Sequence, residues 1–107
     1  MINGKTFAEL ALSFQGVEQV KHFDRIGFKV TGKRMFASYL DANNTANIFL
    51  TPAEQSIFCK MDEANIQPIP NKWGEKGATT FNLDFVQKEF VLEALISAYQ
   101  EVLKQKK

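Results

Sequence analysis

The fold of this chain is decided by residues 16–40, which read GVEQVKHFDRIGFKVTGKRMFASYL. Side chains alternate in character over residues 20–23 and again over residues 28–31, which is the two-residue period of a β-strand. The triplet Thr31-Gly32-Lys33 is typical of a hairpin turn, and residues 34–40 are expected to form the next strand. This stretch therefore predicts consecutive antiparallel strands joined by short turns.

A helix is predicted before these strands, over residues 5–14. Apolar residues at positions 7, 10, 11 and 14 fall on one helical face. The helix is expected to begin either with a capping box of Thr6 and Glu9 or, if it begins earlier, at Asn3. Gly16 is expected to end it, because glycine tolerates left-handed dihedrals.

A fourth strand and a second helix are predicted after residue 40. Residues 41–44 have the composition of a turn, and residues 46–50 close the meander. Thr51-Pro52-Ala53-Glu54 predicts a helix start, because Thr51 caps, Pro52 suits the first helical position and Glu54 completes the box. This helix is expected to run to Asp62.

The remaining chain is expected to hold an irregular segment, a strand and the longest helix. Residues 64–77 contain two prolines and two glycines without a regular period, which predicts a long loop. A strand over residues 79–83 precedes a helix capped by Asp84 with Gln87. Its apolar stripe runs from Val91 to Leu103 and is expected to lie on the sheet.

The predicted element order is α-β-β-β-β-α-β-α. We therefore expect an α+β fold, an antiparallel sheet with helices packed on one face, in a single domain over residues 1–107. Ten phenylalanines are expected to fill a core between the sheet and the helices.

Charge and cysteine content exclude several classes of protein. The net charge is +1, so no global field directs the chain to nucleic acid or to membrane surfaces. Residues 18–34 carry five basic and two acidic residues, which predicts a small basic patch. The single cysteine, Cys59, excludes an internal disulfide and is expected to be a buried structural thiol. No apolar run approaches the ~20 residues of a membrane span, and no signal peptide is apparent. A cytoplasmic monomer is the expectation.

The chain resembles the MmcQ/YjbR-like proteins over nearly its whole length. The residues that carry the resemblance are Ala11-Leu12-Ser13, Gly16-Val17-Glu18, His22-Phe23 with Arg25, Phe28-Lys29-Val30, Gly32-Lys33, Met35-Phe36-Ala37, and Trp73-Gly74 with Gly77. Two positions depart from the family pattern: Gln15 replaces a usual proline, and Ala78 replaces a common aromatic residue. The resemblance implies a small α+β fold akin to type III secretion chaperones, with DNA binding as the function commonly attached to it.

No catalytic or metal constellation is visible in the residues. A nucleophile pair requires His22 to meet Cys59, although the first is predicted in a strand and the second on the inward side of a helix. A zinc site lacks ligands, and residues 74–77 lack the spacing of a phosphate loop. The protein is therefore expected to be non-enzymatic, with no cofactor and no metal.

Two kinds of binding remain open from the sequence. Weak, sequence-indifferent binding of DNA or RNA is favoured by cations and one aromatic residue that are expected to meet: Lys29, Lys33, Arg34, Lys72, Trp73 and Lys76. The alternative is a module for a peptide, a protein or a small ligand, bound in a cleft under residues 64–77. Its pocket is predicted to contain His22, Phe28 and Trp73. His22 is otherwise expected as a structural residue hydrogen-bonded between the sheet and a loop.

Overall fold

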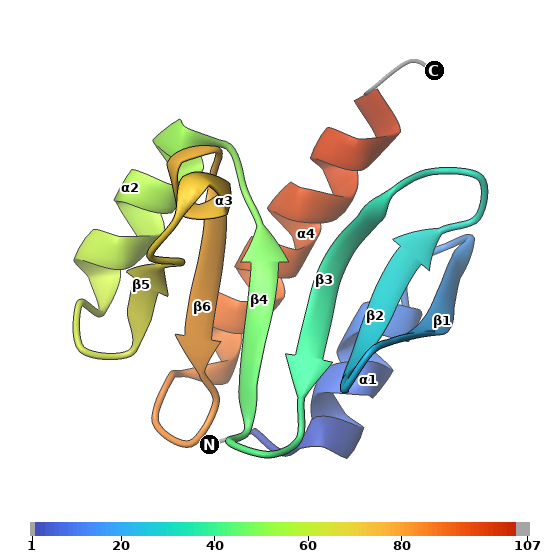
Figure 1. Cartoon of the computed structure of the whole chain (residues 1–107), viewed down its shortest axis with the longest axis horizontal. Coiled ribbons are helices and arrows are strands. Elements are labelled where there is room, and N and C mark those ends of the chain that lie inside the picture. Colours follow the sequence, from blue (N-terminus) through green and yellow to red (C-terminus); the bar gives the residue numbers. More distant parts are fainter. Residues whose placement is uncertain (1, 105–107) are drawn as a thin grey trace.

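The computed structural model describes residues 2–104, which form one six-stranded antiparallel sheet and four helices (Figure 1). The strand order across the sheet is β1-β2-β3-β4-β6-β5. The strands are β1 (Val17–His22), β2 (Arg25–Val30), β3 (Met35–Leu40), β4 (Thr45–Phe49), β5 (Ile66–Pro68) and β6 (Ala78–Asn82). The helices are α1 (Gly4–Leu12), α2 (Pro52–Met61), α3 (Lys72–Glu75) and α4 (Lys88–Lys104). The α+β class and the predicted order of the main elements are confirmed.

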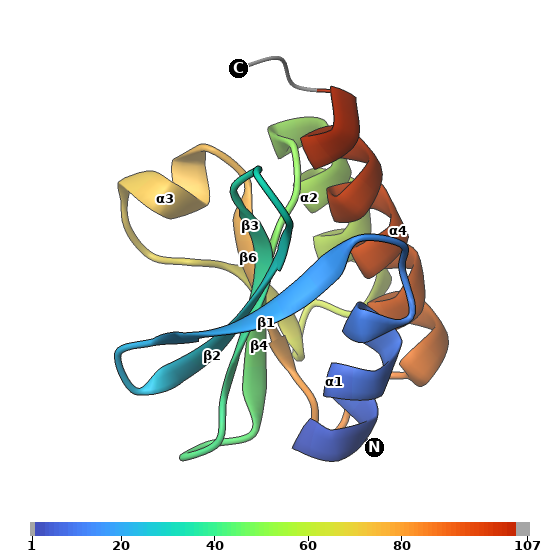
Figure 2. The same cartoon turned by 90° about the vertical axis from the view of Figure 1, so that its right-hand side faces the viewer.

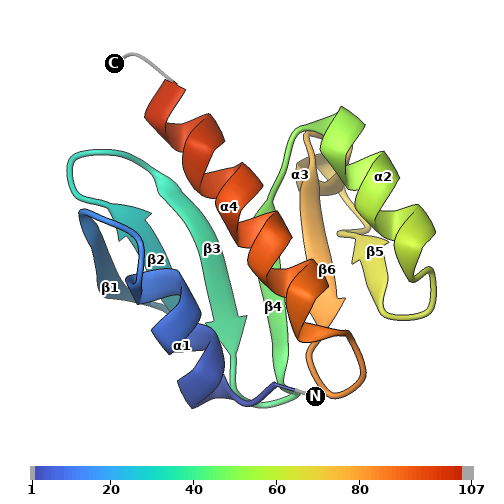
Figure 3. The same cartoon turned by 180° about the vertical axis from the view of Figure 1, so that it is seen from behind.

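The sheet has one face covered by helices and one face that is largely open. Helices α1, α2 and α4 all lie on the same face, with α4 running diagonally across the middle strands (Figure 3). The one-turn helix α3 lies on the opposite side, and the β1–β2 hairpin also projects there (Figure 2). No helix within residues 2–104 is long and apolar enough to cross a membrane.

The core lies between the sheet and the three covering helices. Phe7 of α1 packs edge-on against Phe28 of β2, with ring centroids 5.7 Å apart, and stacks on Tyr39 of β3. On α4, Leu95 is fully buried together with Val91, Ala94, Ala98 and Val102. The predicted packing of this helix is therefore confirmed for most of the stripe, whereas Ile96 and Leu103, which were also predicted to lie on the sheet, are exposed. Burial of this apolar surface is the main force that holds the helices on the sheet.

Two phenylalanines are exposed, against the expectation that this residue type fills the core, and a third, Phe49, lies on the open face of the sheet. Phe23 is 87% exposed at the tip of the β1–β2 hairpin, and Phe85 is 71% exposed before α4. Both lie in turns, where the backbone directs the side chain away from the sheet. Composition alone does not distinguish these positions from the buried ones.

A β-bulge in β3 sets which residues face the open side. Phe28 pairs with Ala37, whereas the adjacent Lys29 pairs with Met35, so Phe36 is an extra residue in β3. Phe36 and Ala37 are both fully buried, while Met35 and Ser38 lie on the open side. The strict two-residue alternation of a regular strand would not allow this arrangement.

The helix starts follow the local sequence. Thr51 and Glu54 form the predicted capping box: the Glu54 N–H donates to Thr51 Oγ1 (3.2 Å), and the Thr51 N–H donates to Glu54 Oε1 (3.0 Å). Asn3 caps α1 by accepting from the Thr6 N–H at 2.8 Å, so the earlier of the two predicted starts is correct. Helix α4 begins at Lys88, later than expected from an Asp84 cap.

The segment predicted as irregular, residues 64–77, contains two short ordered elements. Strand β5 pairs with β6 and is the edge strand of the sheet. Pro68 has no backbone N–H to donate, and an edge strand tolerates this because it has a neighbouring strand on one side only. Helix α3 has only four residues and includes Gly74. Neither element is long enough to produce a period in the sequence, which explains why the prediction missed both.

Candidate binding cleft

A cleft of about 770 Å³ lies on the open face of the sheet, between the end of the β1–β2 hairpin and the α3 segment. The two walls project from the same side of the sheet, away from the covering helices (Figure 2). The cleft is lined by His22 and Arg25 from the hairpin, by Arg34, Met35 and Ser38 from β3 and its preceding turn, by Asn47, Phe49 and Leu50 from β4 and its end, and by Ile69, Asn71, Trp73, Lys76 and Ala78 from the α3 side. A volume of this size is typical of ligand sites.

The α3 wall is fixed by tight backbone packing. A Cβ on Gly74 would lie 1.7 Å from the Ile69 carbonyl oxygen, and one on Gly77 would lie 1.8 Å from that of Leu50. Gly77 also has φ +115°, a conformation that favours glycine. The side-chain amide of Gln55 in α2 donates to the carbonyl oxygens of Gly74 (2.9 Å) and Ala78 (3.0 Å). These contacts hold the α3 turn against the end of the sheet.

Trp73 and Lys76 present an aromatic ring and a cation on this wall. The Asn71 side chain caps α3 by accepting from the Trp73 N–H at 2.8 Å. The Lys76 Nζ lies 5.5 Å from the centroid of the Trp73 ring, which is a cation–π contact. Trp73 remains 64% exposed although its neighbour Gly74 is buried. The ring therefore keeps accessible surface for a second planar group.

The opposite wall is the end of the β1–β2 hairpin. His22 pairs with Arg25, which leaves Phe23 and Asp24 as a two-residue turn. Phe23 has φ +58°, in the left-handed region that a bulky side chain rarely adopts. His22 is exposed, and its ring lies edge-on to that of Phe23 with centroids 5.0 Å apart. The hairpin thus places an imidazole and a strained aromatic residue beside the cleft.

Arg25 is the most constrained polar residue in the cleft. Its Nε donates to Oγ of Ser38 at 2.9 Å, and Ser38 is itself 2% exposed. The Nη2 atom of Arg25 is buried and has no hydrogen-bond partner among the described residues 2–104. Burial lowers the pKa of the Arg25 guanidinium, and the nearby Asp24 carboxylate opposes part of this effect.

The cleft carries charge of one sign. Arg25, Arg34 and Lys76 line it, and no aspartate or glutamate of residues 2–104 is among its lining residues. The whole chain, in contrast, has thirteen basic and twelve acidic residues. Concave walls with one sign of charge raise the local concentration of oppositely charged ligands. The site is therefore suited to an anion.

The structure brings together four of the residues that the sequence predicted for binding. His22, Arg34, Trp73 and Lys76 all line the cleft, although they come from β1, the β2–β3 turn and the α3 segment. Trp73 was predicted for both kinds of binding, and the four predicted residues that the structure brings together lie in the same cleft.

Four other predicted residues lie elsewhere. Phe28 is 1% exposed and packs against Phe7 on the helix-covered face, so the prediction that it lines the pocket is wrong. Lys29 pairs with Glu18 of the neighbouring strand, with Nζ 3.8 Å from Oε2. Lys33, in the β2–β3 turn, and Lys72, the first residue of α3, do not line the cleft.

Arg25 and Ser38 line the cleft, although nothing in the sequence singles them out. Both belong to strands whose alternation is visible in the sequence, but the facing of Ser38 depends on the bulge at Phe36. Arg25 was one arginine among several cations in a basic stretch. The turn at Phe23-Asp24 could have indicated the position of Arg25. This turn pairs Arg25 with His22, so both side chains face the open side of the sheet.

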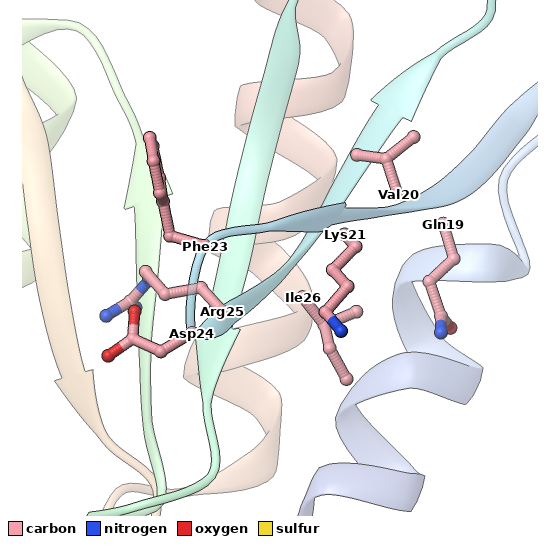
Figure 4. Close-up of a pocket in the computed structure, with 7 residues that line it drawn as sticks. All are labelled: Gln19, Val20, Lys21, Phe23, Asp24, Arg25 and Ile26. Carbon is pink, nitrogen blue, oxygen red and sulfur yellow. The ribbon is translucent and has the colours of Figure 1, made fainter.

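A second hollow of about 530 Å³ surrounds the same hairpin. Figure 4 shows that its labelled residues lie on both sides of the ribbon: Val20 points to one side, whereas Gln19 and Lys21 point to the other. The hollow thus extends around the edge of the hairpin and is not enclosed on one face of the sheet. This hollow is therefore not a single site.

The fold separates the two residues considered as a nucleophile pair. Cys59 lies in α2 on the helix-covered side, and burial raises the pKa of its thiol, which disfavours the reactive thiolate. His22 lies on the open side, so the sheet stands between the two side chains. Within residues 2–104, no group of three His, Cys, Asp or Glu side chains is placed to hold a metal ion.

Comparisons with known proteins identify the fold. No protein-family model matches the chain, and no curated protein matches it in sequence. Among solved structures, the chain is similar to the crystal structure of the Deinococcus radiodurans protein DR2400, a DUF419 domain, with a TM-score of 0.83 and 21% sequence identity. The match covers 98% of this chain and 81% of that one. DUF419 is the family designation of the MmcQ/YjbR-like proteins. The chain therefore has the fold of a DUF419 domain.

Proposed function

We propose that this protein is a non-enzymatic MmcQ/YjbR-like domain that binds nucleic acid weakly and without sequence preference in the cleft of the open face. One observation carries the proposal: the cleft combines Arg25, Arg34 and Lys76 with the exposed ring of Trp73, and no carboxylate of the described residues lines it. Cations hold phosphates, and an exposed aromatic face stacks a base of any identity.

The shape of the site favours a single strand over a duplex. The groove of a duplex is entered by a protruding helix or a two-stranded ribbon with suitable side chains. Here the cations lie inside a concavity, and the adjacent helix α3 has only four residues. Unpaired bases can enter such a cleft and stack on Trp73, whereas the bases of a duplex cannot. We therefore expect single-stranded DNA or RNA to bind better than the corresponding duplex.

Fluorescence anisotropy with a labelled single-stranded oligonucleotide, at two salt concentrations, tests the proposal. We expect a dissociation constant on the order of 10⁻⁴ to 10⁻⁶ M, as for non-specific contacts. The double variant Arg34→Ala/Lys76→Ala should bind more weakly, and its salt slope should fall by roughly 0.7 for each phosphate that the variant no longer neutralises. The control Lys60→Ala/Lys88→Ala removes two exposed cations from α2 and α4, on the far face. Absence of binding at low salt, or an equal weakening in both double variants, would refute the proposal.

A second candidate function uses the same cleft for a peptide or an uncharged small ligand. Apolar side chains favour it, because Met35, Phe49, Leu50 and Ile69 also line the site. The two functions respond differently to salt: phosphate binding weakens steeply as salt rises, whereas apolar docking does not. A ligand whose affinity is unchanged between the two salt concentrations would favour this second function.

A further inference from the structure

We infer that Phe23, at the tip of the β1–β2 hairpin, is a second platform for base stacking, so that a strand bound in the cleft places one base on Trp73 and another on Phe23. The inference rests on the proposed function, because it concerns the same bound strand. It adds a residue that does not line the cleft, and a contact that involves the bases and not the phosphates.

The backbone at Phe23 is the first observation. His22 pairs with Arg25, which leaves Phe23 in a two-residue turn with φ +58°. Such turns favour glycine, asparagine or aspartate at positive φ, whereas a bulky side chain is strained there. Backbone strain of this kind is concentrated at functional sites, where a side chain is kept for contact with a ligand at the expense of stability.

The exposure of the Phe23 ring is the second observation. The ring is 87% exposed, so it contributes little to the packing of the described residues 2–104. Its ring contact is with His22, at 5.0 Å between centroids and 68° between planes. An edge-to-face pair covers at most one face of the Phe23 ring, so at least one face remains for a base.

The place of Phe23 beside the cleft is the third observation. The two residues that flank its turn, His22 and Arg25, both line the cleft. Figure 4 shows the side chains of Phe23 and Arg25 leaving the end of the hairpin on the same side. Trp73 belongs to α3, which forms the facing wall (Figure 2). A strand that crosses the cleft from Trp73 therefore reaches the end of the hairpin.

The charge at the hairpin tip indicates contact with a base and not with a phosphate. Asp24 follows Phe23 in the turn, and its carboxylate repels phosphate. Stacking on an aromatic ring needs no charge, and it tolerates every base because every base has a π-face. Phe23 thus adds affinity without adding sequence preference, while the cations of the cleft hold the phosphates.

The experiment compares Phe23→Asn with the matched control Phe85→Asn. Phe85 is 71% exposed, and neither it nor its chain neighbours Asp84 and Val86 line the cleft. Fluorescence anisotropy at low salt measures the binding of two labelled single strands of equal length, one with bases and one that is abasic throughout. The abasic strand keeps the phosphates but offers nothing to stack.

We expect Phe23→Asn to raise the dissociation constant of the strand with bases at least about fivefold, the lower limit for the loss of one stacked base. Its binding of the abasic strand should not change, and Phe85→Asn should bind both strands as the unmutated protein does. Phe23→Trp keeps an aromatic ring at the hairpin tip, so it should retain the affinity for the strand with bases.

Two further readouts separate stacking from a purely structural role. The salt slope should be the same in Phe23→Asn and in the unmutated protein, since phenylalanine neutralises no phosphate. Thermal unfolding should show that Phe23→Asn is at least as stable as the unmutated protein, because asparagine tolerates the left-handed conformation. A variant that is as stable and binds more weakly identifies a side chain that contacts the ligand.

The outcomes separate this inference from the proposed function. If Phe23→Asn binds the strand with bases as tightly as the unmutated protein, the second platform is wrong and binding in the cleft stands. An equal loss in Phe23→Asn and Phe85→Asn, or a loss that extends to the abasic strand, would overturn the platform in the same way. If the unmutated protein binds neither strand, the proposed function and this inference are both wrong.

Discussion

Arg25 and Ser38 are joined across two neighbouring strands by a hydrogen bond in which Nε of Arg25 donates to Oγ of Ser38 over 2.9 Å. Ser38 is 2% exposed, so its hydroxyl is a polar group in the floor of the open face. The bond fixes the orientation of Arg25. The Nη2 atom of the same guanidinium is buried and has no hydrogen-bond partner among residues 2–104. A serine in the sheet thereby orients a cation in the cleft.

Ser38→Ala should lower the free energy of unfolding by about 1–3 kcal/mol, because Nε of Arg25 then loses its acceptor in a partly buried position. The control Ser56→Ala changes an exposed serine of α2 and should stay within about 0.5 kcal/mol of the unmutated protein. Urea denaturation measures both. Equal stabilities for the two variants would show that the Arg25–Ser38 bond contributes nothing measurable.

Gly77→Ala should displace the α3 wall. Its new Cβ would lie 1.8 Å from the Leu50 carbonyl oxygen, and the backbone there has φ +115°. The matched control is Gly32→Ala, at φ +83° with no atom within 4 Å of the added carbon, so it introduces backbone strain of about 1–2 kcal/mol alone.

The fluorescence of Trp73, the single tryptophan, reports on this wall directly. We expect its emission to change in Gly77→Ala and to stay the same in Gly32→Ala, with the larger loss of stability in the first variant. Unchanged emission in Gly77→Ala would mean that the backbone contact at Leu50 does not position the α3 turn.

Leu95→Ala should lower the free energy of unfolding by about 2–5 kcal/mol, since Leu95 is fully buried between α4 and the sheet. Leu103 lies in the same helix but is 46% exposed, so Leu103→Ala should cost much less. Thermal and chemical unfolding of the two variants provide the comparison. A melting temperature unaffected by Leu95→Ala would contradict the packing of α4 described above.

Phe23→Asn should stabilise the protein by about 1 kcal/mol, because asparagine tolerates the left-handed conformation that costs other residues about 1–2 kcal/mol. Asn44, the other non-glycine residue with positive φ in the described chain, is already of this type. The control is Phe85→Asn, which removes a comparably exposed ring at a position without positive φ. A gain of similar size in both variants would attribute the effect to reduced apolar exposure and not to backbone strain.

Features fixed by neighbouring residues were predictable from the sequence. The Thr51–Glu54 capping box needs only four consecutive residues, and it forms as predicted. The buried stripe of α4 follows from a period repeated over several turns, so the position of Leu95 was also predictable. Patterns that lie within a few consecutive residues, or that repeat over several helical turns, depend little on contacts with the rest of the chain.

Features that depend on packing between distant segments were not predictable. The bulge at Phe36 breaks the expected alternation in β3, and it is visible only in the pairing of β3 with β2. Lys29 and Arg34 are near neighbours in the sequence, yet Lys29 pairs with Glu18 while Arg34 lines the cleft. The arrangement of the strands in space decides which cations lie in the same cleft as Trp73. That arrangement cannot be derived from the pattern of a single sequence.

The two hydrogen bonds of Gln55 connect the cleft to the opposite side of the molecule. Its side-chain amide donates to the carbonyl oxygens of Gly74 and Ala78, while its own N–H donates to the Thr51 carbonyl oxygen in the first turn of α2. A ligand that reduces the motion of the α3 turn should therefore also reduce local opening of the first turn of α2. Occupancy of the cleft should therefore be detectable as slower amide hydrogen exchange at the start of α2, in a helix that the ligand never touches.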